Sequence, residues 1–335
     1  MTTTYDVSTV IVNFNTREDT AQSISTLRAT TAATVQTIVV DNGSSDGSIA
    51  ALREQFPDIT VIDAGANLGF AAGVNRGARM AESPWVLLLN PDVVVLPGAI
   101  DALLAFATAH PEHGIYGGRT LRPDGRTDPS SCWGAMSLWS LTCFATGLST
   151  LFRRSVLFDP ESLGRWERDT VREVPVITGC LLLVSRQNWE LLGGMDECFF
   201  LYGEDADFSA RARTRGLRPV IVPDAAIIHA VGGSTASSGR KMSMVMAGKA
   251  TVLLTSWHPV AARIGIALLQ AGTALRALPG LVRRRDGGMW AGVWHARRDW
   301  RAGYPAAKAS LFGIDEDPHD RHPGIRHLHA EGAER

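Results

Sequence analysis

Carboxylates and amides gather at several points of this sequence where an apolar run gives way to Gly, Ser or Pro. Together with one histidine that closes an apolar run, the residues at these points are Asp41, Asn67, Gly69, Asn75, Asn90, Asp92, Glu204, Asp205 and His229. Amide and carboxylate oxygens bind sugar hydroxyls and hard cations, and a carboxylate can also accept a proton. This set of residues therefore suggests chemistry on a polar, phosphate-bearing substrate.

The strongest candidate for a metal ligand is Asp92. It ends the segment Leu87-Leu88-Leu89-Asn90-Pro91-Asp92, which places a hard oxygen ligand just past an apolar run. Such a ligand suits Mg²⁺ or Mn²⁺ on phosphates, because these ions use few protein carboxylates and fill their shell with phosphate and water. His229, which closes Ile227-Ile228-His229, would favour Mn²⁺ as a nitrogen ligand. A Pro-containing turn and a packing histidine are the alternatives.

Three carboxylates stand within four residues at Glu204-Asp205-Ala206-Asp207, after the aromatic run Phe199-Phe200-Leu201-Tyr202. They repel one another unless a cation, hydrogen-bond donors or a helix N-terminus balances them. The aromatic run before them indicates that they face a pocket, where one could act as a general base. The alternative is the acidic first turn of a solvated helix.

Two Gly-containing segments mark entries into helices. Asp41-Asn42-Gly43-Ser44-Ser45-Asp46-Gly47 puts a carboxylate at a strand end, where it could accept hydrogen bonds from a nucleobase or ribose. The segment Asn67 to Gly77 lets the backbone approach a ligand closely, although it lacks the G-x-G-x-x-G spacing. An ordinary turn with an N-cap and tight helix–sheet packing are the respective alternatives.

Short apolar strands alternate with helical segments through most of the chain. The strands are expected at Val7–Val12, Thr37–Val40, Ile59–Ile62, Trp85–Leu89, Gly179–Val184 and Arg218–Val222. The helices are expected at Glu18–Leu27, Ser48–Gln55, Ala71–Met80 and Glu204–Arg215, with a further helical region at Lys249–Trp300. This alternation predicts an α/β fold with a mostly parallel sheet flanked by helices. Ligands of such sheets bind beyond the carboxyl ends of the strands, where Asp41 and Asp92 fall.

Composition excludes several other classes. The 335 residues carry a net charge of −1, which argues against a nucleic-acid partner. The four cysteines form no C-x-x-C pair, and Met1 to Asp6 has no apolar signal, so we expect reduced packing cysteines in a cytoplasmic protein. The stretch Cys132 to Leu151 is uncharged but rich in Ser and Thr, and we expect an interfacial insert there.

Three regions are expected: residues 1–240 as the α/β domain with an apolar insert at about 120–172, residues 241–312 as a helical extension, and residues 313–335 as a loose polar tail. The extension mixes Arg with Trp, and the residues concerned are Arg283, Arg284, Arg285, Arg297, Arg298, Arg301, Trp290, Trp294 and Trp300. That mixture suits the anionic surface of a membrane, while a packed helix with a solvated basic face is the alternative. A zinc site from the tail residues His319, His322, His327 and His329 is less favoured than a loose tail, since no cysteine lies nearby.

The order of these motifs resembles glycosyltransferase family 2, enzymes with the Rossmann-like GT-A fold, and especially its bacterial rhamnosyltransferase-like branch. The matching pieces, which span about Val7 to Ser234, are Val12-Asn13-Phe14-Asn15, the Asp41-to-Gly47 and Asn67-to-Gly77 segments, Asn90-Pro91-Asp92, Gly193-Gly194-Met195-Asp196-Glu197 with Phe199-Phe200, Gly203-Glu204-Asp205, and His229. Jointly these motifs are highly specific.

The resemblance implies a role for each candidate residue. Asp205 would be the catalytic base with Glu204 and Asp207 near it, and Asp92 and His229 would hold Mn²⁺ or Mg²⁺ on the donor diphosphate. Asp41 would contact the nucleobase or ribose. The remaining residues implied for binding the nucleotide sugar are Asn13, Asn15, Asn67, Gly69, Asn75 and Asn90.

The implied reaction is an inverting transfer of L-rhamnose from dTDP-L-rhamnose to a polyprenyl-diphosphate-linked sugar in cell-wall or polysaccharide assembly, at the inner face of the cell membrane. Another nucleotide sugar with a non-lipid acceptor is the first alternative. A non-catalytic nucleotide-sugar-binding module is the second, and Asp92, Asp205 and His229 argue against it. A nucleotidyltransferase is disfavoured because Val10 to Arg17 has no Gly- and Arg-rich phosphate loop. The sequence predicts no oligomeric state.

Overall fold

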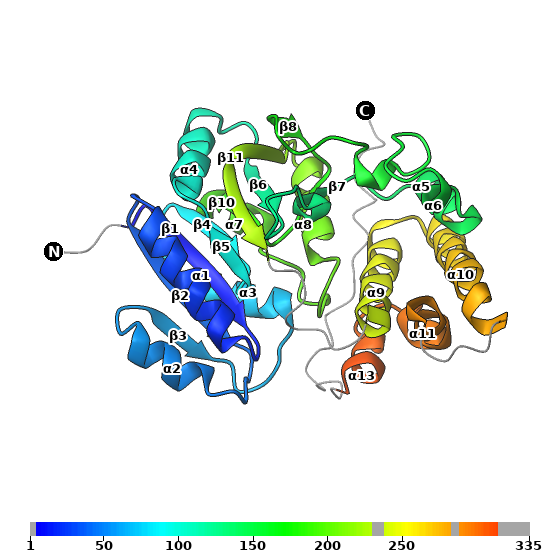
Figure 1. Cartoon of the computed structure of the whole chain (residues 1–335), viewed down its shortest axis with the longest axis horizontal. Helices are drawn as coiled ribbons and strands as arrows, with labels where there is room; N and C mark the ends of the chain where they lie inside the picture. The colour runs from blue at the N-terminus through cyan, green and yellow to red at the C-terminus, as the bar shows by residue number, and fades with distance from the viewer. Residues whose placement is uncertain (1–4, 230–237, 283–287, 314–335) are drawn as a thin grey trace, which may run out of the picture.

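Apolar runs rich in β-branched residues and leucine form one nine-stranded sheet in the computed structural model, which describes residues 5–229, 238–282 and 288–313 (Figure 1). The path of the sheet is β3-β2-β1-β4-β10-β6-β11-β5, with β8 paired to β11. Its strands are β1 (Val7–Asn13), β2 (Val35–Asp41), β3 (Thr60–Asp63), β4 (Trp85–Leu89), β5 (Val93–Val95), β6 (Ile115–Leu121), β8 (Arg172–Glu173), β10 (Leu181–Ser185) and β11 (Val220–His229). A separate pair joins β7 (Cys132–Trp133) to β9 (Val176–Ile177).

Helices cover both faces of the sheet, as the alternation of elements predicts. These are α1 (Arg17–Thr30), α2 (Ser48–Gln55), α3 (Phe70–Ala78), α4 (Ala99–Ala109), α7 (Arg186–Leu192) and α8 (Glu204–Thr214). Successive residues of a strand point to opposite faces, so in β1 Ile11 packs with α1, α2 and α4, whereas Val10 packs with α3, α7 and α8. The expected α/β class with a large central sheet is confirmed.

The sheet is parallel from β3 to β4 and mixed beyond it. β10 runs antiparallel between β4 and β6, and β11 is parallel to β6 and antiparallel to β5. The sequence suggested two separate apolar runs at Arg218–Val222 and Ile227–His229. They form one strand, β11, whose register shifts between Val222 and Ala226. Such a bulge lets a strand bend without losing its partners.

The uncharged stretch Cys132–Leu151 forms two short helices, α5 (Leu138–Thr146) and α6 (Leu148–Leu151). Ser137 starts α5 with a capping box shared with Ser140, and Gly147, at φ 79°, separates the two helices. Among the described residues, no helix has the length and hydropathy needed to cross a bilayer.

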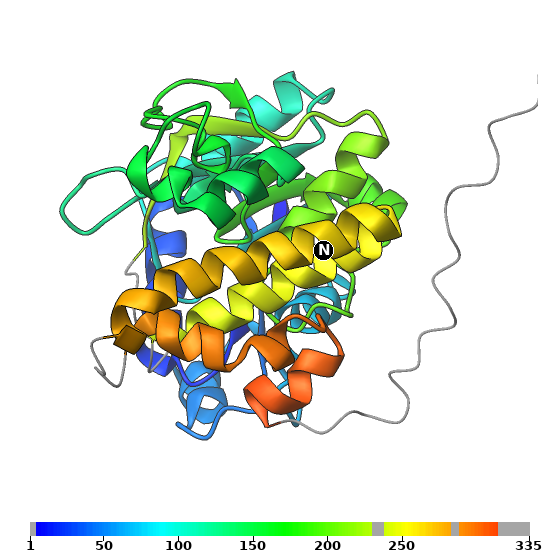
Figure 2. The same ribbon diagram turned by 90° about the vertical axis from the view of Figure 1, so that its right-hand side faces the viewer.

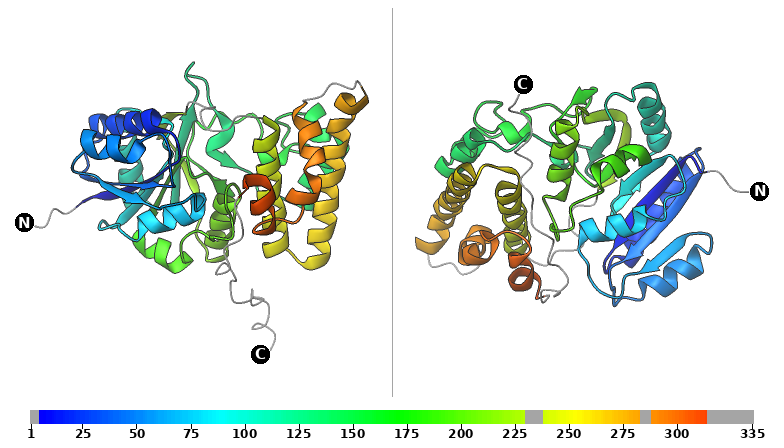
Figure 3. Two further views of the ribbon diagram at one scale, coloured as in Figure 1. Left: turned by 90° about the horizontal axis from the view of Figure 1, so that it is seen from below. Right: turned by 180° about the vertical axis from the view of Figure 1, so that it is seen from behind.

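The C-terminal region is helical, as expected, but it is broken into α9 (Ser238–Ser256), α10 (Pro259–Val282), α11 (Met289–His295), α12 (Arg297–Trp300) and α13 (Ala306–Phe312). These helices form a layer beside the sheet domain (Figure 3). A third hydrophobic cluster joins them to Leu141 of the insert and to Phe199 and Phe200. The insert and the extension therefore share one core.

The expected Arg/Trp membrane surface is wrong for one of its main residues. Trp300 is completely buried, and its Nε1 donates a hydrogen bond to the carbonyl of Val293 at 2.8 Å. Trp290 packs against the same cluster. Gly232-Gly233-Ser234, the arginines at 283–285 and the tail with its four histidines lie outside the described residues.

Candidate functional site

The expected metal ligands lie next to each other. The Nε2 atom of His229 is 3.0 Å from Oδ1 of Asp92. The antiparallel pairing of β5 with β11 produces this contact, because it sets His229 opposite Val93, the residue that follows Asp92. The chain therefore brings together two residues that are 137 positions apart.

This pair suits a divalent ion bound to phosphates. Nδ1 of His229 is buried and has no hydrogen-bond partner in the part of the chain that the structure describes. A carboxylate oxygen beside an imidazole nitrogen forms a donor set that Mn²⁺ accepts readily. No cluster of three His, Cys, Asp or Glu side chains with metal-site geometry occurs among the described residues. Most ligands of the ion would then come from substrate phosphates and water, as is usual for Mg²⁺ sites.

Glu204 and Asp205 begin α8, directly after Gly203, whose φ of 104° reverses the chain. Oδ1 of Asp205 accepts a hydrogen bond from the amide of Ala206 at 2.8 Å. Burial raises the pKa of Asp205 to about 6. Burial, and then the charge of Asp205, raises the pKa of Glu204 to about 8. Both carboxyls are therefore harder to ionise than free ones, and the rise is the larger for Glu204, which favours Asp205 as the carboxylate that ionises first.

Cys180 connects the metal pair to this carboxylate pair. Its thiol accepts a hydrogen bond from Nδ2 of Asn90 at 3.3 Å, and its carbonyl accepts one from the Asn90 amide. Burial raises the pKa of the Cys180 thiol to about 12, and the nearby charges of Asp92 and Asp205 contribute to that rise. Cys180 thus lies near both Asp92 and Asp205. Composition alone predicts a packing role for Cys180, although its place just before β10 could have indicated this edge of the sheet.

Asn13 and Asp41 are neighbours in the register of β1 and β2, and both are completely buried. Nδ2 of Asn13 donates to Oδ2 of Asp41 at 2.6 Å, and the Ser44 amide donates to Oδ1 of Asp41 at 2.8 Å. This network holds the loop after β2 in place. A direct contact of Asn13 or Asp41 with a nucleotide stays a prediction. Asn15, with a φ of 54°, is exposed beside them and accepts a hydrogen bond from the Ser45 amide.

Only glycine fits at position 69, because the backbone there lies against the aromatic run that precedes Glu204. Its φ is +87°, and a Cβ added there would lie 2.5 Å from the carbonyl oxygen of Phe200. The Phe70 amide donates to that same oxygen at 2.8 Å, and Asn67 Oδ1 accepts from the Gly69 amide at 3.0 Å. Asn67 and Gly69 thus fix the start of α3 against the chain that leads to Asp205.

Asn75 forms hydrogen bonds with the loop after α7. Its Nδ2 donates to the Met195 carbonyl and to Oε1 of Glu197, and its Oδ1 accepts from the Met195 amide, all within 2.9 Å. Both amide hydrogens are therefore in use. Asn75 therefore ties α3 to the Gly193–Glu197 loop, and a contact of this residue with the donor stays a prediction.

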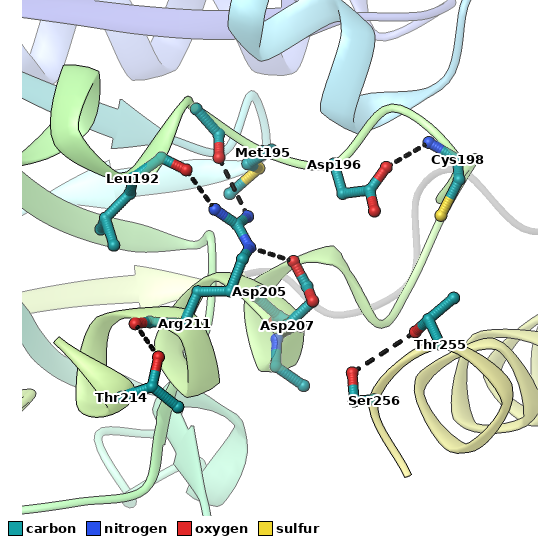
Figure 4. Close-up of polar contacts among 12 residues, drawn as sticks. Leu192, Met195, Asp196, Cys198, Asp205, Asp207, Arg211, Thr214, Thr255 and Ser256 are labelled. Carbon is teal, nitrogen blue, oxygen red and sulfur yellow. Dashed lines mark hydrogen bonds and ion pairs between the residues drawn. The ribbon is translucent and has the colours of Figure 1, made fainter. Parts of the chain in front are cut away.

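Asp207 is separated in function from its acidic neighbours. Its Oδ2 accepts a hydrogen bond from Nε of Arg211 at 2.7 Å, and the same guanidinium donates to the carbonyls of Leu192 and Gly194 (Figure 4). Arg211 therefore neutralises Asp207, and its hydrogen bonds to the Leu192 and Gly194 carbonyls hold α8 against the end of α7 and the loop after it. This leaves Glu204 and Asp205 as the carboxylates available for chemistry.

The C-terminal helices support the turn that carries Asp205. A Cβ added to Gly248 of α9 would lie 2.1 Å from the Tyr202 carbonyl oxygen. The Tyr304 hydroxyl donates to the Leu201 carbonyl at 2.8 Å, and the Tyr304 amide donates to the Thr251 hydroxyl. The extension therefore fixes the position of the Leu201–Gly203 turn, even though it lies far from this turn in sequence.

Replacing Gly248 by Ala should reduce kcat by at least about tenfold and lower the Tm, because the new methyl group must displace the backbone just before Glu204. The matched control is Gly292→Ala on α11, where the nearest atom to an added Cβ is 3.8 Å away. That control should gain about 0.5–1 kcal/mol of stability and keep its activity. Equal behaviour of the two variants in kinetics and thermal melting would show that α9 does not support the turn.

Comparisons with known proteins agree with this geometry. The sequence profile described as "Glycosyl transferase family 2" matches residues 8–159. An N-acetylglucosaminyl-diphospho-decaprenol L-rhamnosyltransferase of Mycobacterium tuberculosis is 34% identical over 226 residues, which cover 63% of this chain and 72% of the relative. The chain belongs to glycosyltransferase family 2. The similarity supports its placement in the rhamnosyltransferase-like branch of this family.

This family 2 glycosyltransferase is also similar to a hexosyltransferase and to two solved structures. The low-salt glycan biosynthesis hexosyltransferase Agl10 of Haloferax volcanii is 29% identical over 63% of each chain. Among solved structures, the mannosyltransferase PcManGT of Pyrobaculum calidifontis has a TM-score of 0.50 at 17% identity. The match covers 94% of this chain and 89% of the mannosyltransferase chain. S. aureus TarS 1-349 has a TM-score of 0.51 at 14% identity, with 92% of each chain covered. These neighbours support the GT-A fold.

Proposed function

We propose that this glycosyltransferase moves L-rhamnose from dTDP-L-rhamnose to the sugar of a polyprenyl-diphosphate-linked acceptor, with inversion and with the help of Mn²⁺ or Mg²⁺. The similarity to the mycobacterial rhamnosyltransferase, whose name gives a sugar-diphospho-decaprenol acceptor, supports the donor sugar and the lipid. The observations that support the catalytic proposal are the contact between Asp92 and His229 and the position of Cys180, which is near enough to both Asp92 and Asp205 for their charges to raise its pKa.

The metal part of the proposal rests on the Asp92–His229 contact at 3.0 Å. The solved neighbour PcManGT was obtained with GDP-Man and Mn²⁺, which supports the same use of the fold here. When bound, a divalent ion would neutralise charge that develops on the leaving diphosphate. Asp92 and His229 would hold it, and Asn90 would keep the turn between β4 and β5 against Cys180.

The inverting part rests on a single ionised carboxylate. The acceptor hydroxyl oxygen would form a bond to the anomeric carbon while the bond from that carbon to the diphosphate oxygen breaks. The hydroxyl proton would pass to Asp205, and the nucleotide diphosphate would leave with the bonding electrons. One base suffices for this in-line displacement, whereas a retaining mechanism also needs a nucleophile. Protonated Glu204 would donate a hydrogen bond at the same edge of the sheet.

We also propose that the protein works in the cytoplasm at the inner face of the cell membrane, in cell-wall or polysaccharide assembly, because a polyprenyl acceptor stays in the bilayer. The alternative within the family is another nucleotide sugar with a non-lipid acceptor. The relative named as a hexosyltransferase of glycan biosynthesis supports this alternative, so the donor sugar has to be tested.

A thermal-shift screen of nucleotide sugars with and without Mn²⁺ tests the donor. dTDP-L-rhamnose with Mn²⁺ should raise the Tm, since a ligand at about 100 times its Kd stabilises the folded state by about 2.7 kcal/mol. UDP-glucose and GDP-mannose serve as matched controls and should give smaller shifts. A larger shift with one of these donors would replace rhamnose in the proposal, and no shift with any donor would contradict the transferase site.

A further inference from the structure

The outward face of α10 is apolar along most of its length. The exposed apolar positions recur at helical spacing, and they are Val260, Ile264, Ala267, Ala271, Leu275 and Leu278; Arg263, Pro259 and Pro279 are exposed as well. Hydrophobic residues on a helix normally turn toward a core, and the opposite face of α10 already does so, through Ala262 and Leu269. A stripe of apolar side chains therefore remains on the surface without a partner within the described chain.

The insert extends this stripe. Leu275 contacts Gly147, since a Cβ added to Gly147 would lie 3.2 Å from a methyl carbon of Leu275. Beside it, Arg276 donates hydrogen bonds to the Phe144 carbonyl and the Thr150 hydroxyl. The next residues of the insert, Leu151 and Phe152, are 74% and 44% exposed. Figure 2 shows α10 in front, beside the helices of the insert, so the two elements form one surface.

Arginines line the insert side of this surface. A hollow of about 360 Å³ is bordered by Arg153, Arg154 and Arg165 together with the hydroxyls of Thr150 and Ser155. Arg154 pairs with Glu167 at 3.4 Å, whereas Arg153 and Arg165 are exposed and have no ion-pair partner in the described parts of the chain. The segments 132–158 and 259–282 contain neither Asp nor Glu. The surface is thus both apolar and cationic.

We propose that this surface docks on an anionic phospholipid bilayer; we call it the docking face and define it by Leu151, Phe152, Ile264, Leu278, Arg153 and Arg165. Apolar side chains enter the boundary between head groups and acyl chains, while arginines remain at the level of the phosphates. This inference rests on the proposed lipid-linked acceptor and deepens it. It assigns membrane contact to the insert and α10 rather than to the Trp residues of α11 and α12.

The docking face is also connected to the catalytic turn. Lys249 of α9 pairs with Glu161 at 2.5 Å, in the chain that returns from the insert. Its neighbour Gly248 touches the Tyr202 carbonyl just before Glu204.

A bilayer is favoured over a second copy of the chain, because a two-fold contact through this face would bring Arg153 and Arg165, which have no ion-pair partner in the described parts of the chain, toward their own copies.

Co-sedimentation with phosphatidylcholine vesicles, with and without phosphatidylglycerol, tests the docking face. Ile264→Glu with Leu278→Glu should reduce partitioning onto both kinds of vesicle by at least about tenfold, since two charges would have to enter the apolar layer. Arg153→Gln with Arg165→Gln should reduce it by roughly thirtyfold only on vesicles that contain phosphatidylglycerol. The matched control, Met80→Glu with Leu191→Glu, changes two similarly exposed apolar residues of the sheet domain and should bind like wild type.

Two results would overturn the assignment directly: wild-type protein that sediments with neither kind of vesicle, or an Ile264→Glu/Leu278→Glu protein that binds vesicles like wild type. A third is that light scattering shows a wild-type dimer, the same variant is monomeric, and neither protein binds vesicles. Transfer to a water-soluble acceptor analogue is measured on the same proteins. Transfer without vesicle binding would leave the proposed function intact and remove the docking face. Vesicle binding without any transfer would leave the docking face intact and contradict the proposed function.

Discussion

Replacing Asp205 by Asn is expected to lower kcat by about two to four decades. The substitution keeps the shape of the side chain and its hydrogen bond from the Ala206 amide but removes the proton acceptor. The affinity for the donor should change little, because the base acts on the acceptor hydroxyl. Steady-state kinetics combined with calorimetric binding of the donor would measure both effects.

The two neighbouring carboxylates provide the controls. Asp207→Asn should cost far less, since Asp207 serves Arg211 and not the reacting atoms. Glu204→Gln should also cost less, because burial and the charge of Asp205 raise the pKa of Glu204, and the neutral Gln side chain can still donate a hydrogen bond. Normal turnover by Asp205→Asn, together with an inactive Glu204→Gln enzyme, would move the base to Glu204. Activity in all three variants would contradict the transferase role of this motif.

The pH profile gives a second readout of the same base. Burial raises the pKa of Asp205 to about 6, so kcat of the wild-type enzyme should rise with pH through that value as the carboxylate loses its proton. The rise should persist in Glu204→Gln and disappear in the residual activity of Asp205→Asn. A profile that is flat between about pH 5 and 7 would argue against Asp205 as the base.

Much of the fold could be predicted because its signals are local. The helix expected at Ser48–Gln55 has the bounds of α2, and the strand expected at Trp85–Leu89 has those of β4. In both, the pattern of buried residues and the flanking Gly, Pro or Ser residues lie within a few positions of the element. The parallel pairing of β1 with β2 then follows from their alternation with α1, and it sets Asn13 beside Asp41.

The parts that the sequence did not predict depend on partners that are distant in the chain. Only the family resemblance predicted that Asp92 and His229 would meet, because their contact requires β5, a three-residue strand that no local pattern indicated, to pair with the end of β11. Asn75 was expected at the ligand because of its neighbours in the sequence, whereas its hydrogen bond to Met195, 120 positions away, had no local signal. Trp300 resembles a surface tryptophan beside two arginines until the fold encloses it between α9 and α11.

Chelation with EDTA is expected to abolish transfer, and Mn²⁺ or Mg²⁺ should restore it. The reason is the charge that develops on the leaving diphosphate, whose stabilisation by a bound cation amounts to several kcal/mol, or about two decades or more in rate. Asp92→Ala should show the same loss even with excess Mn²⁺, because it removes the carboxylate beside His229. Removing one exposed carboxylate elsewhere, in Asp124→Ala, is the matched control for the change in net charge and should leave activity intact.

Donor binding separates a metal ligand from a residue that only supports the fold. In calorimetry, Mn²⁺ should tighten donor binding to the wild-type enzyme and to Asp124→Ala but much less to Asp92→Ala, because Asp92 and His229 would hold the ion that neutralises the diphosphate. His229→Ala should behave like Asp92→Ala if both side chains hold the same ion. Wild-type enzyme that stays fully active in chelator would remove the metal from the mechanism. An Asp92→Ala enzyme with normal Mn²⁺-dependent donor affinity would instead show that the ion binds elsewhere, and the buried, unpaired Nδ1 of His229 would then need another partner.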